Sequence, residues 1–427
     1  MVSVMAWNIE RFGAFSSLKT GADGKSILGT LEAISIIVQG YGADVLVIQE
    51  FRKNGRVHLP ALAAFLENKT GVAWSFDYLP GAFKAWTALT DVKSIENLEY
   101  TGRANSEGYA VLWKDGSLTA IGATSPKMSV GRNGDPSAQG YINLILRGAN
   151  AAWKYDSVPP FRASSGDYEG PAGFPLPACI RVQNDNQNKF INFTILQFGN
   201  ARRPCWIRVN TTKNAIVPVV VYHAPVSRPS CLYGAYACAL TKAVGSDTTK
   251  HVVVAGDFNL TTESDFKKLY DGEDLKNGTA DTSGGSQYGY SRSQIQYQQV
   301  GVNPAALVDN NSIYEHPRDL LFYRDTLDIA SSGVANVVAD LQNDSKAMTN
   351  AIINAGYVKA AFKAAIDATD DDYRLPAVVR QNNNLMAALQ APFQSTAPQK
   401  AFASTLAAAT FYRCFISDHL PVGITLN

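Results

Sequence analysis

Three features that mark special classes of protein are missing from this sequence. Its five cysteines include no Cys-x-x-Cys pair, which argues against a disulfide framework or a zinc site and favours reduced thiols. No apolar run approaches the roughly 18 residues that span a bilayer. The first residues lack the basic segment that opens a secretory signal. We therefore expect a cytoplasmic protein with no membrane segment.

The sequence also has no excess of charge of one sign. Lys and Arg total 38 and Asp and Glu total 37, giving a net charge of +1. A large basic surface is therefore not expected, although a local basic groove is compatible with this balance. Hydrophobic residues make up 46% of the chain, as in a folded globular protein.

Short runs rich in β-branched and aromatic residues predict strands, and apolar residues at helical spacing predict helices between them. The expected strands are Val2–Asn8, Asp44–Gln49, Tyr109–Lys114, Phe190–Gln197, Ile216–Tyr222, Val252–Gly256 and Gly423–Leu426. The expected helices include Thr30–Gln39 and His58–Asn68. This pattern indicates a layered α/β or α+β architecture.

Three stretches have the composition of insertions. Residues 133–186 are rich in Pro and Gly and are expected to be mostly loop, apart from a strand at Tyr141–Leu146. Residues 276–299 form a polar loop. The Ala-rich residues 351–410 predict helices packed outside the catalytic strands, after which Arg413–Asp418 is expected to return as a strand.

Polar side chains stand where five of the apolar segments end. They are Asn8, Glu50, His223, Asp257 with Asn259, and Asp418 with His419. Taken singly, each has an ordinary interpretation, such as a turn residue, a surface charge or a buried pair. Their repetition at strand ends instead indicates one site, because such groups are costly to bury unless they are paired or bind a metal.

The residue types agree on one chemistry. The carboxylates and amides offer only oxygen ligands, which suit Mg²⁺ or Mn²⁺. The two histidines can stabilise phosphate charge or move protons near neutral pH. Together these groups fit metal-assisted attack of water on a phosphate ester.

The motifs NIERFG, ADVLVIQEFR, EGYAVLWK, VVVYHAPV, VVVAGDFNL and SDHLPV carry a family resemblance. In this order they resemble the endonuclease/exonuclease/phosphatase superfamily, and its deoxyribonuclease-I-like branch in particular. The resemblance implies one catalytic domain over 1–427, with the three insertions outside the family's pattern. It also implies a four-layer α/β (α+β) sandwich, in which two mainly antiparallel sheets pack face to face with helices outside.

The resemblance assigns roles residue by residue. Glu50 would be the principal ligand of Mg²⁺ or Mn²⁺, with Asn8 and Asp418 near the same cation. Asp257 would orient or deprotonate the attacking water, and Asn259 would hold a phosphate oxygen. His223 and His419 would flank the scissile phosphate.

Four further residues have less specific signals. The resemblance makes Glu107 the partner of His223 and Asp319 the partner of His419; Asp319 also precedes an apolar strand, unlike Asp325 and Asp328. Arg52 is either a substrate-phosphate contact or a solvated arginine. Tyr109 is either a core aromatic residue or a substrate contact.

These residues favour a metal-dependent phosphodiesterase that acts on nucleic acid, with DNA endonuclease activity as the leading hypothesis. The features that favour this branch are QEFR, the spacing of Glu107 and Tyr109, and the HAP segment. A lipid phosphodiesterase of the sphingomyelinase type, another phosphoesterase and an inactive binding protein remain alternatives.

Overall fold

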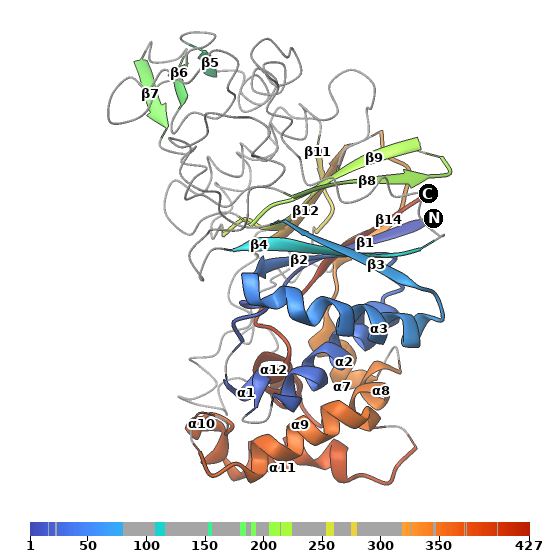
Figure 1. The fold of residues 1–427 in the computed structure, drawn as a ribbon, viewed down its shortest axis with the longest axis vertical. Helices are drawn as coiled ribbons and strands as arrows, with labels where there is room; N and C mark the ends of the chain where they lie inside the picture. The colour runs from blue at the N-terminus through green and yellow to red at the C-terminus, as the bar shows by residue number, and fades with distance from the viewer. Residues whose placement is uncertain are drawn as a thin grey trace.

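The computed structural model describes residues 1–79 (except 16, 22 and 23), 107–115, 153–155, 180–184, 189–193, 205–223 (except 214), 253–259, 275–279 and 318–427 (except 325, 345, 346, 371, 373 and 399). Within them, two β-sheets lie face to face, and helices cover the outer face of one sheet (Figure 1). A third sheet is small.

The first sheet has six strands in the order β13-β14-β1-β2-β4-β3. Its strands are β1 (Val2–Asn8), β2 (Val45–Phe51), β3 (Trp74–Leu79), β4 (Gly108–Lys114), β13 (Ile329–Val334) and β14 (Val422–Leu426). β1 and β2 are parallel, and all other neighbours are antiparallel.

The second sheet has five strands in the order β11-β12-β10-β9-β8. Its strands are β8 (Cys205–Thr211), β9 (Ala215–Val221), β10 (Val253–Asp257), β11 (Leu275–Asn277) and β12 (Asp319–Arg324). Here β9 and β10 are the parallel pair. The expected sandwich of two mainly antiparallel sheets is confirmed.

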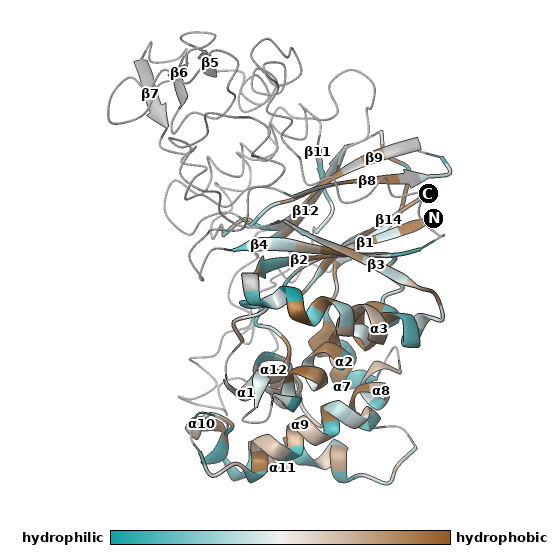
Figure 2. Ribbon diagram, viewed as in Figure 1, coloured by the Kyte–Doolittle hydropathy of each residue, from teal (hydrophilic) through white to brown (hydrophobic). Residues whose placement is uncertain are grey.

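Alternation of side chains along the strands builds two cores. In β1, Val4 and Ala6 point toward the second sheet, whereas Met5 and Trp7 point toward the helices. The inter-sheet core consists largely of valines from both sheets, and the other core lies between the first sheet and the helices (Figure 2).

The helical layer is built around α2 (Lys25–Gly40), which is buried along most of its length and packs against four of the described helices, α1, α3, α8 and α9. The other helices of the described residues are α1 (Ser17–Thr20), α3 (Leu59–Thr70), α7 (Val337–Asn343), α8 (Met348–Asn354), α9 (Gly356–Asp367), α10 (Ala377–Arg380), α11 (Asn383–Gln394) and α12 (Thr405–Phe415), and η1 (Lys53–His58) is a 3-10 helix. None of the described helices is both long and apolar enough to cross a membrane. The helical layer expected over the outer face of the second sheet lies outside the described residues.

The Ala-rich region joins this layer through polar as well as apolar contacts. Glu32 of α2 is buried, and its Oε2 accepts the backbone N–H of Tyr357 in the first turn of α9 at 2.9 Å. This carboxylate satisfies a donor that the helix itself leaves unpaired. The strand expected at Arg413–Asp418 is wrong, because α12 continues to Phe415. Its aromatic residues at helical spacing, Phe411 and Phe415, are buried in the helical layer.

The small third sheet differs from the expectation for residues 133–186. Strands β5 (Trp153–Tyr155) and β6 (Ile180–Asn184) lie inside that stretch and pair with each other, and β6 also pairs with β7 (Lys189–Phe193). The abundance of Pro and Gly obscured two short strands. The strand expected at Tyr141–Leu146 lies outside the described residues, as does most of the polar loop 276–299.

Candidate active site

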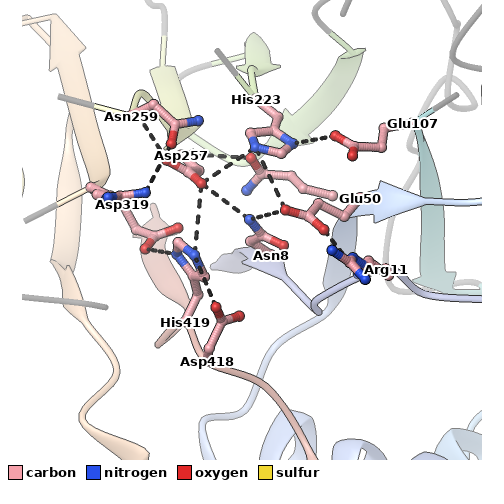
Figure 3. A network of polar contacts seen from close by, with 12 residues as sticks. Asn8, Arg11, Glu50, Glu107, His223, Asp257, Asn259, Asp319, Asp418 and His419 are labelled. Carbon is pink, nitrogen blue, oxygen red and sulfur yellow. Dashed lines mark hydrogen bonds and ion pairs between the residues drawn. The ribbon is translucent and has the colours of Figure 1, made fainter. Parts of the chain in front are cut away.

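The parallel pair in each sheet delivers polar residues to one place. Asn8 ends β1 and Glu50 is near the end of β2, while Asp257 ends β10 and His223 follows β9 by two residues. Because the carboxyl ends of these strands meet where the two sheets approach each other, the four side chains lie close together (Figure 3).

Glu50 is aimed by an irregularity in β2. The pairing of β2 with β4 shifts between Ile48 and Phe51, and Glu50 has a φ of 54°, in the left-handed region that non-glycine residues rarely adopt. Its Oε2 accepts the backbone N–H of Arg11 at 3.0 Å, and its Oε1 accepts Nδ2 of Asn8 at 3.1 Å. Strain of this kind is typical of sites where a side chain must be held in one direction.

Gly256 allows β10 to pass close to the end of β9. Its φ is 135°, and a Cβ at this position would lie 2.2 Å from the carbonyl oxygen of Tyr222. Only glycine fits both the backbone conformation and this approach. The close approach sets Asp257 beside His223.

Asp257 is the centre of the polar network. Its Oδ2 lies 3.1 Å from Nδ2 of Asn8, 3.4 Å from Nε2 of His223 and 3.9 Å from Nε2 of His419. Its Oδ1 accepts the backbone N–H of Asn259 at 2.8 Å. The side chain is 2% exposed, so one carboxylate is shared among buried donors from both sheets.

Each histidine lies beside a carboxylate of its own. Nδ1 of His223 is 3.4 Å from Oε2 of Glu107, and Nδ1 of His419 is 2.7 Å from Oδ2 of Asp319. In both cases Nε2 is the ring nitrogen that faces Asp257. Asp328, by contrast, is exposed and pairs with Lys213 at 3.2 Å, while Asp325 lies outside the described residues.

Charges in the network shift two pKa values in opposite directions. Burial alone would raise the pKa of Asp257, but the charge of His419 and the hydrogen bond with His223 hold it well below its usual range. Burial alone would lower the pKa of His419, but the carboxylates of Asp319 and Asp257 outweigh it and raise the pKa of His419 to about 9. At neutral pH the site therefore pairs a carboxylate with an imidazolium.

The residues expected to bind a cation are only partly brought together. Asn8 and Glu50 are in contact, whereas Oδ2 of Asp418 forms an ion pair with Nη1 of Arg413 at 2.5 Å. Within the described chain, two groups have ligand atoms within 4.8 Å of one another: Glu50, Glu107 and His223, and Asp257, Asp319 and His419. Asp418 is in neither group.

Two buried oxygens nevertheless fit a divalent cation. Oδ1 of Asn8 and Oδ1 of Asp418 are buried and accept no hydrogen bond from the described residues, although such oxygens are normally paired. A hard cation is the partner that such oxygen atoms prefer. The donor set of this site therefore fits a divalent cation.

Arg52 and Tyr109 have clear places in the structure. Arg52 is 8% exposed and its Nη2 lies 2.6 Å from Oε1 of Glu107, so it is not a freely solvated arginine. Tyr109 is 2% exposed in the inter-sheet core, and its hydroxyl accepts the backbone N–H of His223 at 2.9 Å. The structure thus favours the core interpretation of Tyr109.

The sequence prediction omitted several residues that shape the site. Oε1 of the buried Gln49 accepts the backbone N–H of Asp257 at 2.9 Å, which ties β2 to β10 across the sandwich. Nη1 of Arg318 lies 3.2 Å from Oδ1 of Asn259. One signal in the sequence pointed to these two residues, which was adjacency to a predicted site residue. Gln49 directly precedes Glu50, and Arg318 directly precedes Asp319.

A family model matches most of the chain. The model of the endonuclease/exonuclease/phosphatase family matches residues 5–341, which is more than half of the chain. The chain belongs to this family. As a member of the endonuclease/exonuclease/phosphatase family it is a hydrolase of phosphoester bonds. Asp418 and His419 lie beyond the matched range, so their place in the site is seen from the geometry.

Solved structures of similar fold come from several organisms. The mannosyl-6-phosphatase Bt3783 of Bacteroides thetaiotaomicron VPI-5482 is 10% identical, with 100% of both chains covered and a TM-score of 0.42. Truncated TDP2 of Caenorhabditis elegans is 11% identical, with 100% of this chain and 97% of that chain covered and a TM-score of 0.38. The human Nocturnin catalytic domain with bound sulfate is 12% identical, with 78% of this chain and 86% of that chain covered and a TM-score of 0.36.

These likenesses are too distant to carry information on the substrate. No curated protein sequence matches the chain.

Proposed function

We propose that this chain is a phosphodiesterase dependent on Mg²⁺ or Mn²⁺ that cleaves nucleic acid, with DNA as the preferred substrate and internal cleavage as the mode. The observation that carries the proposal is the convergence of His223 and His419 on Asp257, each histidine having a carboxylate on its far side. Two imidazoles beside a buried carboxylate are groups that suit acid–base chemistry on a phosphate ester.

The residues that would hold the cation are Glu50, Asn8 through Oδ1, and Asp418 through Oδ1. When bound there, the cation would polarise a phosphoryl oxygen and offset charge in the transition state.

Asp257 would orient the attacking water, and His419 would stabilise charge on the phosphate. The low pKa of Asp257 keeps its carboxylate ionised, so it can accept a hydrogen bond from water and orient it for attack. The imidazolium of His419 would stabilise negative charge that develops on the phosphate oxygens. His223 would contribute from the side of Asp257 opposite His419. Its Nδ1 lies beside Oε2 of Glu107, and its backbone N–H donates to the hydroxyl of Tyr109.

Asn259 and Arg318 would contact the phosphate oxygens. Asn259 has a φ of 52°, and with Arg318 at its Oδ1, its amide nitrogen is the group that can donate to a substrate oxygen. Arg318 adds a guanidinium beside it, and guanidinium groups suit phosphate because they donate in a planar fork.

The preference for DNA rests on the resemblance and on the pairing of Arg52 with Glu107. QEFR, the Glu107–Tyr109 spacing and HAP follow the deoxyribonuclease-I-like pattern. The Arg52–Glu107–His223 contacts join these three segments. Nη2 of Arg52 lies 2.6 Å from Oε1 of Glu107, and Oε2 of Glu107 lies 3.4 Å from Nδ1 of His223.

The test is a parallel assay on supercoiled plasmid, single-stranded DNA, RNA, sphingomyelin and a phosphomonoester, with Mg²⁺ or Mn²⁺ and with EDTA. We expect nicking of the plasmid that EDTA stops. Faster hydrolysis of sphingomyelin or of the monoester would replace the proposed substrate by a lipid or small phosphoester. Binding that survives EDTA without turnover on any substrate would identify an inactive binding protein.

Glu50→Gln separates catalysis from folding in the same assay. It removes the charge proposed to bind the cation but keeps the volume of the side chain, so activity should fall by several orders of magnitude. The matched control is Glu67→Gln on the exposed surface of α3, which should retain activity. Wild-type turnover by Glu50→Gln at saturating Mg²⁺ would contradict the assignment of Glu50.

A further inference from the structure

Helix α12 contacts both members of the Asp418–His419 pair. The hydroxyl of Tyr412 donates to the carbonyl oxygen of His419 at 2.5 Å, and the next residue, Arg413, forms the 2.5 Å ion pair with Asp418. The indole of Trp7 donates to the same carbonyl at 2.9 Å and stacks on Tyr412. The last turns of α12 are therefore part of the wall of the site.

The two carboxylate oxygens of Asp418 have different surroundings. Oδ2 contacts Arg413 and lies 3.8 Å from Nε2 of His419. Oδ1 is buried and, within the described part of the chain, accepts no hydrogen bond. Leaving a buried carboxylate oxygen without a donor costs free energy, so this atom is suited to a ligand that the described residues do not supply.

Arg413 is itself restrained by charge. Its side chain is 22% exposed, and its positive charge lowers the pKa of Glu10. Burial alone would raise the pKa of Glu10, but Lys19, 3.0 Å away, and Arg413 together lower it. The guanidinium of Arg413 thus interacts electrostatically with Glu10 as well as forming the ion pair with Asp418.

We propose that Arg413 is a positioning residue that holds Asp418 by Oδ2 and so directs Oδ1 to the divalent cation. The inference rests on the proposed function, in which Asp418 is one of the cation ligands. Groups that hydrogen-bond a metal ligand commonly fix its orientation, and their loss typically weakens metal binding about 10- to 100-fold. Arg413 lies beyond residues 5–341, so this support comes from a part of the chain that the family match does not reach.

Two physical effects of Arg413 on cation binding oppose each other. Its positive charge repels a cation, whereas its contact with Oδ2 keeps Oδ1 in place. If repulsion dominated, removing the guanidinium would tighten binding; if positioning dominates, removing it weakens binding. The sign of the change in affinity therefore distinguishes the two effects.

The experiment is titration of Mn²⁺ into the metal-free full-length chain by isothermal calorimetry. We expect Arg413→Met to weaken Mn²⁺ binding about 10- to 100-fold, and Arg413→Lys, which keeps a charged donor, to recover part of the loss. The matched control is Arg380→Met on α10, which Figure 1 places at the end of the helical layer far from the sheets. Its Mn²⁺ affinity should match the wild type.

A double-mutant cycle tests whether Arg413 acts through Asp418. Asp418→Asn should weaken Mn²⁺ binding, and adding Arg413→Met to it should cause less than a twofold further loss, because the two changes remove one interaction. Equal or tighter Mn²⁺ binding by Arg413→Met would overturn the inference, and so would losses that multiply in the double variant. In either case, Mn²⁺ binding by the wild type would leave the proposed function intact. Absence of Mn²⁺ binding by the wild type would overturn both.

Discussion

Asp257 and Asp319 lie directly opposite each other on neighbouring antiparallel strands, and His419 lies between their carboxylates. Nδ1 of the imidazole is 2.7 Å from Asp319, and Nε2 is 3.9 Å from Asp257. The closer carboxylate binds Nδ1, so Nε2 is the ring nitrogen that faces Asp257. The register of β10 and β12 therefore orients the imidazole.

Replacing Asp319 by Asn should lower both kcat and the pKa of His419. The change keeps the shape of the side chain but removes the main charge that stabilises the imidazolium, as in other acid–histidine pairs. The measurements are kcat on plasmid DNA and an NMR titration of the His419 ring. Asp328→Asn is the control, because Asp328 is exposed and pairs with Lys213; a larger loss in this control would contradict the role of Asp319.

The pKa of His419 also predicts how stability changes with pH. In the unfolded chain a histidine titrates near pH 6.5, whereas in the folded chain His419 titrates near pH 9. A group with a raised folded-state pKa contributes stability that is fully present below pH 6.5 and is lost as the pH rises through about 9. Urea unfolding in EDTA from pH 6 to pH 10 should show this loss in the wild type.

The control for this pH dependence is His419→Gln, which removes the titrating group. Between pH 7 and pH 10 the free energy of unfolding should fall less in His419→Gln than in the wild type. Parallel curves for the two proteins would mean that His419 is not the group responsible.

Gly256→Ala should destabilise the fold as well as the site. The added Cβ would lie 2.2 Å from the carbonyl oxygen of Tyr222. The backbone φ of 135° is also one that residues other than glycine rarely adopt. We expect a loss of roughly 3 kcal/mol in the free energy of unfolding, measured with urea. Gly333→Ala in β13 is the control, because no atom of the described residues beyond its chain neighbours lies within 4 Å of the added Cβ. Similar losses in both variants would refute the close-approach argument.

Much of the site could be predicted because its residues follow buried strands. Asn8, Glu50 and Asp257 each end an apolar run, and the hydrophobic pattern of a strand is local information. Strand ends were therefore readable without knowing the order of strands in the sheets. The contact of Asp319 with His419 could be anticipated only from the resemblance and from the strand that Asp319 begins.

Other features depend on contacts that sequence patterns do not encode. The hydrogen bond from Asp257 to Gln49 joins residues from different sheets, and the ion pair of Arg413 with Asp418 depends on where α12 ends. The segment before Asp418 contains β-branched and aromatic residues that suit a strand as well as a helix. Its packing against Trp7 and the helical layer makes it a helix, which is why the predicted strand was wrong.

The shared position of Asp257 and His419 leads to a prediction about their combined loss. Nε2 of His419 lies 3.9 Å from Oδ2 of Asp257, and the charge of each shifts the pKa of the other. We expect Asp257→Asn and His419→Ala each to remove most of the activity, and the double variant to be little worse than either one. The effects of mutating residues that act in the same transition state are strongly non-additive, since losing one already disables the step that the other serves.

The measurement is kcat for the three variants on one substrate, with circular dichroism to verify that each is folded. Losses that multiply strictly in the double variant would show that Asp257 and His419 serve separate steps, and would remove the central pairing from the proposed mechanism.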